Sequence, residues 1–171
     1  EMRSHAPQSE LTANIWVTIR EKVMTPPYES AKLITFPDTR FFHCNMKTLN
    51  LLPTVLASEK AARAGADEAI FHRSGRVTEC AHSNISILKD GVLITAPADN
   101  MILAGVARGH LIDFCRRFGI EVVEEHFTVE EMMTAAEIIV NPYAVKLAGK
   151  LIGFKRVLRQ IFEVAFRTGN C

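Results

Sequence analysis

The fold of this chain is decided by the stretch FFHCNMKTLNLL, residues 41–52. Residues 40–46 are rich in side chains that favour β-strands, and the sequence from Asn50 onward is compatible with a helix. This pattern predicts that Lys47 lies where a strand gives way to a helix. A lysine at a strand end is most often a solvated edge residue. The motifs that follow along the chain therefore decide whether Lys47 has a chemical role.

Two further motifs lie downstream of Lys47. The first, RVTECAHSN at residues 76–84, places Glu79 at the end of the second strand of an apparent hairpin. The second, MILAGVAR at residues 101–108, opens a helix with a turn of small residues. The unpaired N–H groups and the dipole of a helix start favour an anion. Taken singly, each motif also fits a simpler interpretation, an exposed glutamate on a strand and a tight turn before a helix.

Composition predicts one ordinary domain with a hydrophobic core. The chain has 171 residues, 48% of them hydrophobic, and a formal net charge of +1. Acids and bases are interspersed, so we expect neither a nucleic-acid partner nor attraction to an acidic membrane. No apolar run approaches the roughly twenty residues of a membrane helix, and no signal-peptide pattern is present at the N-terminus. This composition does not exclude binding of a small anionic ligand by a few local groups.

Cysteine usage bears on compartment and metal binding. The four cysteines, at positions 44, 80, 115 and 171, occur singly and without CxxC spacing. This pattern argues against a zinc site and against a disulfide framework. We therefore expect no metal and a cytoplasmic location.

Apolar alternation and turn residues predict short strands. Residues 14–20 place Ile15, Val17 and Ile19 on one face, as in a half-buried strand. Ser74-Gly75 and Asp90-Gly91 each predict a hairpin turn. The strands predicted in this way span residues 14–20, 32–36, 40–46, 68–72, 76–80, 84–89, 92–96, 121–127, 137–140 and 144–148.

A helical period predicts four helices between these strands. The first begins near Asn50 and stops at Gly65, with Leu52, Val55 and Leu56 near one face. The others are expected at residues 105–118, at 128–136 after a capping box, and at 154–168. The helix at 105–118 is expected to bury its apolar residues, Val106, Leu111, Ile112, Phe114 and Cys115. Together these elements predict a strand-rich α/β (α+β) domain.

The order of the three motifs closely resembles that of the class IV aminotransferases, which use pyridoxal 5′-phosphate (PLP). A strand-end lysine, a Thr-Glu pair leading to Ser-Asn, and a Leu-x-Gly-x-x-Arg helix entry follow one another between residues 34 and 140. The resemblance implies the large domain of fold type IV, a strand-rich pseudo-barrel with flanking helices, at residues 31–171. It also implies a remnant of the small N-terminal α/β domain at residues 1–21 and a linker at 22–30.

The resemblance assigns the two groups that act on the cofactor ring. Lys47 matches the lysine that forms the internal aldimine and later moves a proton between the substrate Cα and the cofactor C4′. Glu79 matches the carboxylate that stabilises the protonated ring nitrogen, which lets the ring accept electrons from Cα.

Phosphate binding is implied at the helix entry. In the resemblance, the backbone amides of Val106 and Ala107 face the phosphate, Leu103 packs on the ring, and Gly105 lets the backbone approach closely. Some relatives carry threonine where Ala107 stands, so that hydroxyl contact is absent here.

Substrate binding is implied near the N-terminus. Arg3-Ser4-His5 has the Arg-x-His form that holds the substrate α-carboxylate in D-amino-acid aminotransferases, and Arg3 suits this role because a guanidinium can meet both carboxylate oxygens. In that subgroup the pair acts across a dimer interface, so a homodimer is implied. The implied reaction is ping-pong transamination of a D-amino acid such as D-alanine with a 2-oxo acid such as 2-oxoglutarate.

Two departures from the family keep other interpretations open. The family's phosphate-binding arginine and a tyrosine near the substrate have no counterpart, and the Ser/Thr-rich loop expected after Val140 is short. These differences predict either a truncated chain or a sequence from which segments are missing. The alternatives are a branched-chain aminotransferase, an aminodeoxychorismate lyase, or an inactive remnant that acts as a binding module.

Overall fold

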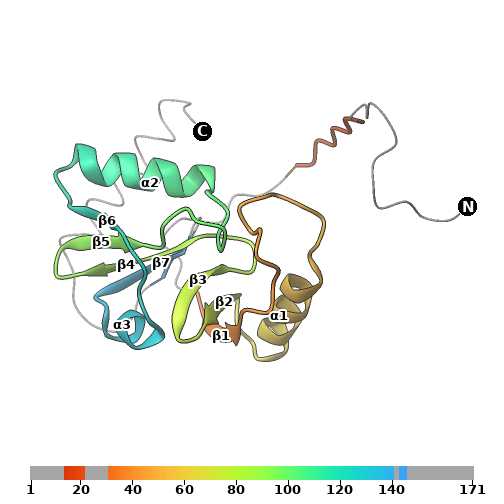
Figure 1. The fold of residues 1–171 in the computed structure, drawn as a ribbon, viewed down its shortest axis with the longest axis horizontal. Helices are drawn as coiled ribbons and strands as arrows, with labels where there is room; N and C mark the ends of the chain where they lie inside the picture. The colour runs from red at the N-terminus through yellow and green to blue at the C-terminus, as the bar shows by residue number, and fades with distance from the viewer. Residues whose placement is uncertain (1–13, 22–30, 141–142, 146–171) are drawn as a thin grey trace, which may run out of the picture.

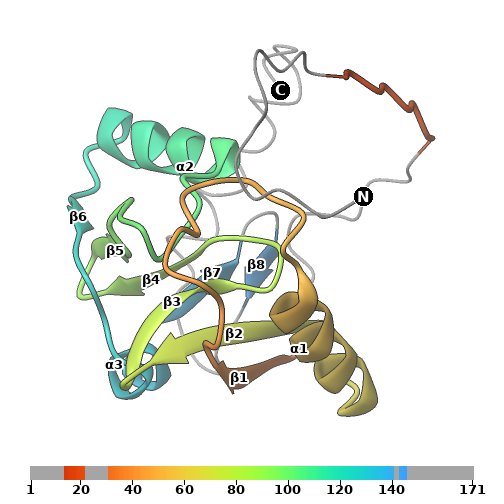
Figure 2. The same ribbon diagram turned by 45° about the vertical axis from the view of Figure 1, so that its right-hand side comes forward.

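A computed structural model describes residues 14–21, 31–140 and the strand at 143–145 (Figure 1). Its strands form a three-stranded sheet and a five-stranded sheet. Helix α1 and helix α2 lie at opposite sides of the molecule, with the sheets between them (Figures 1 and 2). The mixed α/β architecture expected from the sequence is confirmed.

The three-stranded sheet has the order β1-β2-β3. Strands β1 (Leu33–Pro37) and β2 (Glu68–Arg73) are parallel, and helix α1 (Leu52–Arg63) lies in the connection between them. Strand β3 (Arg76–Cys80) returns antiparallel to β2. The predicted Ser74-Gly75 turn joins them with φ of 52° and 80°, as a two-residue hairpin requires.

The five-stranded sheet has the order β6-β5-β4-β7-β8. Its central hairpin joins β4 and β5 through the predicted Asp90-Gly91 turn, where φ is 51° and 83°. Strand β6 pairs parallel to β5, and β7 pairs antiparallel to β4 and β8. The strands span Ile85–Lys89 (β4), Val92–Thr95 (β5), Val122–Glu124 (β6), Glu137–Val140 (β7) and Tyr143–Val145 (β8).

Alternation along β4 and β7 divides the core into two layers. One face of these strands packs with residues of the three-stranded sheet, so the two sheets share a core. The other face packs against α2 (Val106–Arg117) through its residues Leu111 and Cys115. The shared core contains Ile70, Val77, Cys80, Ile85, Ile87, Phe127, Met132, Ala135, Ile138 and Val140.

Helix α3 (Val129–Thr134) begins with the predicted capping box. The Thr128 side chain accepts from the Glu131 N–H at 3.1 Å, and the Glu131 carboxylate accepts from the Thr128 N–H at 2.9 Å. Met132 then points into the shared core. The cap and the apolar contact thus hold a helix of only 6 residues.

Helix α1 differs from expectation in the face that it buries. Ala57 and Ala61 pack against Ala69 and Phe71 of β2, because small side chains let a helix lie close to a sheet. The larger residues of the helix instead face outward, with Leu52, Val55 and Leu56 exposed by 68%, 58% and 51%.

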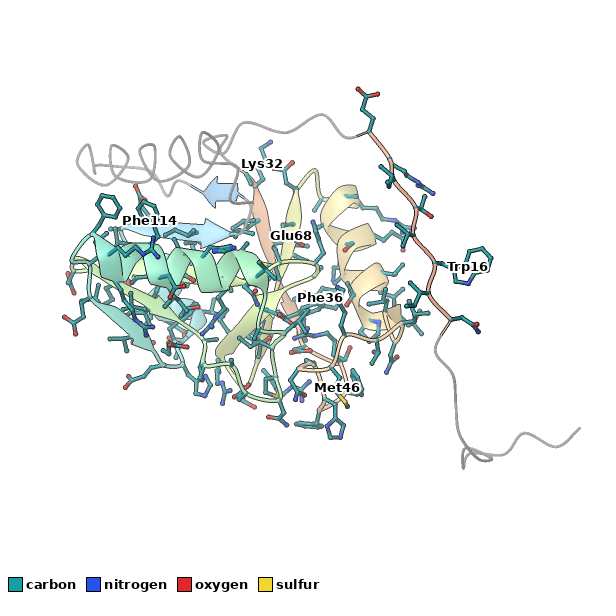
Figure 3. The ribbon with its side chains drawn as sticks, turned by 90° about the horizontal axis from the view of Figure 1, so that it is seen from above. Trp16, Lys32, Phe36, Met46, Glu68 and Phe114 are labelled. Carbon is teal, nitrogen blue, oxygen red and sulfur yellow. The ribbon has the colours of Figure 1, made fainter. Side chains whose placement is uncertain are left out.

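Two predicted strands are wrong. Residues 14–20 form no strand, and their apolar side chains are exposed, with Trp16 projecting outward (Figure 3). An alternating apolar pattern forms a strand only if a neighbouring strand pairs with it, and no described strand pairs with residues 14–20. Residues 40–46 form a loop, because Arg40 turns inward to two carboxylates and Cys44 is held by the Asn100 carbonyl at 2.9 Å.

Smaller differences concern element ends and exposure. The strand predicted at 121–127 is the shorter β6, and the one predicted at 144–148 begins one residue earlier, as β8. Val106, predicted to be buried, is 78% exposed, because it occupies the first position of α2 beyond the sheet. The predicted helix at 154–168 and the linker at 22–30 lie outside the described residues. Across the described ranges, every helix is too short or too polar to cross a membrane.

Candidate active site

A cavity of about 320 Å³ lies between the loop from β1 to α1, the end of β3 and the turn before α2. Its walls include four of the residues singled out from the sequence, Lys47, Glu79, Leu103 and Gly105. Val106 and Ala107 follow directly in the first turn of α2, and both are exposed. The fold thus brings together residues separated by up to about sixty positions, in a cavity of the size that cofactors occupy.

Lys47 is carried by the loop between β1 and α1, so it does not end a strand. The loop is tied to the turn before α2, since the Asn100 side chain donates to the Phe42 carbonyl at 2.9 Å. Met46, labelled in Figure 3, lies on the same loop and also lines the cavity. The hydrogen bonds of Phe42 and Cys44 with Asn100 thus fix the loop that carries the exposed Lys47, although this loop is not part of a strand.

Glu79 presents a buried carboxylate to the cavity, with the residue only 6% exposed. Arg40 donates to its Oε1 atom. The Asn84 side chain and the Leu103 N–H both donate to Oε2, each at 3.1 Å. Burial raises the pKa of Glu79, and the charge of Arg40 opposes that rise.

Arg40 is fixed on its other side by Asp38. The Arg40 Nε donates to Asp38 Oδ1 at 3.0 Å and Nη2 donates to Oδ2 at 2.9 Å, in a two-pronged pair. Its guanidinium also lies 4.6 Å from the centre of the Phe71 ring. Burial alone would raise the pKa of Asp38, but Arg40 outweighs it and holds that pKa below its usual value.

Asn84 joins the carboxylate to the turn before α2. Its Nδ2 donates to Glu79 Oε2 and, at 2.7 Å, to the Leu103 carbonyl, while its Oδ1 accepts from the Gly105 N–H at 3.2 Å. A Cβ atom on Gly105 would lie 2.3 Å from Asn84 Oδ1. Glycine is therefore required at this position by the close approach of the Asn84 side chain.

The start of α2 offers backbone donors beside this turn. Gly105 is the N-cap residue, with extended backbone and no side-chain cap hydrogen bond. The N–H groups of a first helical turn have no carbonyl within the helix to bind, and the helix dipole is positive there. This end of the cavity can therefore hold an anion.

Some of the polar groups at this site were not singled out from the sequence. Asp38, Arg40 and Asn84 all contact one another or Glu79. Pro37-Asp38-Thr39 has the composition of a surface turn, which concealed the burial of Asp38. Arg40 directly before two phenylalanines was the available signal, because an arginine at the edge of an apolar run is often paired. Arg3 and His5 lie outside the described residues.

Comparison with known proteins identifies the family. The family model described as amino-transferase class IV matches residues 8–141, so the chain belongs to the class IV aminotransferases. The cofactor of this family is pyridoxal 5′-phosphate.

Within that class the chain is similar to D-alanine aminotransferases. It is 44% identical over 119 residues to the D-alanine aminotransferase of Listeria innocua serovar 6a, covering 70% of this chain and 41% of that one. It is 43% identical over 119 residues to the enzyme of that name from Staphylococcus epidermidis, covering 67% and 42%. The chain thus spans about two fifths of the length of these curated relatives.

Solved structures agree on the fold. A fold IV transaminase from Curtobacterium pusillum is similar with a TM-score of 0.66 at 22% identity, covering 76% of this chain and 51% of that one. A branched-chain amino acid aminotransferase from Thermobaculum terrenum is similar with a TM-score of 0.61 at 26% identity, covering 70% and 42%. The fold type IV architecture expected from the sequence is confirmed.

The residues present suit pyridoxal phosphate chemically. A carboxylate has about four acceptor positions, and the three donors on Glu79 leave room for one more, such as a protonated ring nitrogen. An amine lines the same cavity at Lys47, and the first turn of α2 offers N–H groups for a phosphate.

Proposed function

We propose that the protein catalyses PLP-dependent transamination of a D-amino acid such as D-alanine, with a 2-oxo acid such as 2-oxoglutarate as acceptor. The donor and the acceptor react in turn, in ping-pong order. The observation that carries this proposal is that Lys47 and Glu79 line one cavity. The similarity to enzymes named D-alanine aminotransferase supports the substrate class.

Each site residue has a separate task in this proposal. Bound pyridoxal phosphate supplies the electron sink for the charge that develops on the substrate Cα. Lys47 would hold the cofactor by its aldehyde and, once released, would move the proton at the substrate Cα. Glu79 would accept a hydrogen bond from the protonated ring nitrogen. Leu103 would pack on the ring, and the N–H groups of Val106 and Ala107, next to Gly105, would hold the phosphate.

Substrate selection is assigned to Arg3 and His5, which we propose hold the α-carboxylate from a second subunit of a homodimer. The outward-facing apolar residues Leu52, Val55 and Leu56 of α1 support association, since an exposed apolar stripe of this kind is costly in water. We also propose a cytoplasmic protein with its cofactor domain at residues 31–171, a remnant of the small domain at 1–21, and a linker at 22–30. Sedimentation velocity tests the dimer, and a single monomeric species at every concentration contradicts it.

The cofactor linkage provides the test of the reaction class. The purified chain is incubated with PLP and reduced with borohydride, and its peptides are analysed by mass spectrometry. We expect the reduced cofactor on Lys47, and we expect Lys47→Ala to abolish both this adduct and transamination. Lys32→Ala, which removes an exposed lysine at the other end of β1, is the control and retains both. A Lys47→Ala chain that transaminates as well as the parent refutes the proposal.

The main alternative to a D-amino acid is a branched-chain amino acid as the substrate. It is raised by the similarity, at 26% identity, to a structure named as a branched-chain amino acid aminotransferase. The two substrates are separated by assaying D-alanine against L-leucine, each with 2-oxoglutarate as acceptor. Faster turnover of D-alanine, lost in Arg3→Ala, is the expected result. Faster turnover of L-leucine, or D-alanine turnover unchanged by Arg3→Ala, removes the substrate assignment while leaving the cofactor chemistry in place.

A further inference from the structure

Asp38 is the most fully enclosed charged group beside the cavity, yet no step of the proposed reaction uses it. Its side chain is 0% exposed, and it does not line the cavity wall. It is linked to the cavity through Arg40, which contacts Asp38 with one edge and Glu79 with its Nη1 atom. A buried ion pair of this kind is costly to desolvate and is a weak source of stability, so its presence beside the cavity calls for a function.

We propose that Asp38 is a positioning residue for the cofactor ring, acting through Arg40 on the carboxylate of Glu79. Asp38 orients Arg40, and Arg40 then turns the Glu79 carboxylate so that its remaining acceptor position faces the ring nitrogen. This inference rests on the proposed function, because it concerns the same cofactor.

The geometry around Asp38 leaves Arg40 little freedom. Asp38 accepts from the Arg40 backbone N–H and from Nε, both at 3.0 Å to Oδ1, and from Nη2 at 2.9 Å to Oδ2. A planar guanidinium held along one edge has its remaining nitrogen aimed in a fixed direction. Here that nitrogen, Nη1, meets Glu79 Oε1.

Asp38 is itself held by neighbours on β3 and β2. The Thr78 hydroxyl donates to Asp38 Oδ2 at 2.9 Å, and Arg73 lies 3.4 Å from Oδ1 with a side chain that is 22% exposed. Arg73 also donates to the Arg40 carbonyl at 2.7 Å. The orientation of Arg40 is thus fixed by several residues together, on β2, on β3 and at the end of β1.

The charges lead to the same conclusion. Arg40 lies between two carboxylates, and Arg73 lies 3.4 Å from Asp38, so Asp38 is paired with both arginines. Because Arg40 is shared between Asp38 and Glu79, Glu79 keeps part of its negative charge for a protonated ring nitrogen. Without Asp38, Glu79 would be the only carboxylate paired with Arg40, and the cationic guanidinium would compete with the ring for it.

Cofactor binding tests this inference without recourse to activity. Dissociation constants are measured for PLP and for 1-deazapyridoxal 5′-phosphate, in which carbon replaces the ring nitrogen. In Asp38→Asn we expect PLP binding to weaken by about tenfold, the scale of one charge-assisted hydrogen bond, and binding of the deaza compound to change by less than about twofold. Asp67→Asn, the same change at an exposed position near the other end of β1, leaves both constants unchanged.

The two ligands separate positioning from a merely structural role. Equal weakening of both compounds in Asp38→Asn, or no weakening of either, overturns the inference. If Asp38→Asn does not fold, as judged by circular dichroism, Thr78→Val decides, because it removes one hydrogen bond to Asp38 Oδ2 at nearly constant volume. A smaller loss confined to PLP is then expected, and an equal loss for both ligands overturns the inference. A parent chain that binds neither compound refutes the proposed function itself.

Discussion

Asn84 shows how one side chain can tie the two ends of the site together. Its amide contacts the Glu79 carboxylate, the Leu103 carbonyl and the Gly105 N–H. A shift of the turn before α2 is therefore transmitted to the carboxylate that faces the cavity. The position of the turn before α2 and the orientation of Glu79 depend on the same buried amide.

Gly105→Ala tests this connection. The new Cβ would lie 2.3 Å from Asn84 Oδ1, so the Asn84 side chain must move, and its bonds to Glu79 and Leu103 are lost or weakened. We expect the free energy of unfolding to fall by about 1–3 kcal/mol, the usual cost of overpacking, and PLP binding to weaken by about tenfold. Urea unfolding and cofactor titration measure the two effects.

Gly109→Ala is the matched control for that substitution. Gly109 lies in the same helix, and a Cβ there meets nothing within 4 Å. Alanine is a better helix former than glycine, so we expect stability to rise by about 1 kcal/mol with cofactor binding unchanged. If Gly105→Ala behaves like Gly109→Ala, the contact with Asn84 has no role in the site.

At this scale the sequence predicted two residues that line the cavity, Lys47 and Glu79, but not the residues that orient Glu79. The resemblance led to Lys47 and Glu79 because each occupies a motif with a fixed order along the chain. The pairing of Arg40 with Asp38 and Glu79 depends on β1 and β3 meeting β2 in one sheet. A pairing of that kind has no local signature in the sequence.

Among the elements, both predicted hairpins formed, whereas strands predicted from apolar pattern alone formed at β1 and β7 but not at residues 14–20 and 40–46. Ser74-Gly75 and Asp90-Gly91 specify turns by their own backbone preferences, and both turns have positive φ. Residues 14–20 and 40–46 have a composition typical of strands, but a segment forms a strand only when a neighbouring segment pairs with it. Local turn chemistry therefore predicted structure here better than apolar pattern did.

Thr128→Ala tests the contribution of the capping box to α3. The substitution removes the side-chain acceptor for the Glu131 N–H, while the backbone N–H of residue 128 can still donate to the Glu131 carboxylate. We expect a loss of about 1 kcal/mol in the free energy of unfolding, measured in urea. The control is Thr134→Ala at the other end of α3, where the hydroxyl donates to backbone carbonyls of the same helix. For this variant the free energy of unfolding should change by no more than about 0.5 kcal/mol. Equal losses in both variants contradict a specific role for the cap.

For the molecule as a whole, the site lies where loops from both sheets meet. Helix α1 packs on the three-stranded sheet through alanines, α2 packs on the five-stranded sheet, and the two sheets share the core between them. The cavity is bounded by the loop before α1, the end of β3 and the turn before α2. Its shape therefore depends on the packing of both sheets, so global stability and cofactor binding are linked.

Alkaline pH should destabilise the whole fold through Cys115, which lies fully buried between α2 and the five-stranded sheet. Burial raises the pKa of this thiol from its ordinary value of 9.0 to about 11. The unfolded chain loses the proton first, so the free energy of unfolding is unaffected below about pH 9 and falls by roughly 2–3 kcal/mol as the pH rises to 11. Urea unfolding across this range should show a shallower decline in Cys115→Ala, with a residual slope from the buried thiol of Cys80, whose pKa burial also raises. Leu111→Ala, a cavity in the same cluster without a thiol, should lower stability at every pH and keep the parent's slope. If Cys115→Ala keeps that slope as well, the thiol is not the group that titrates.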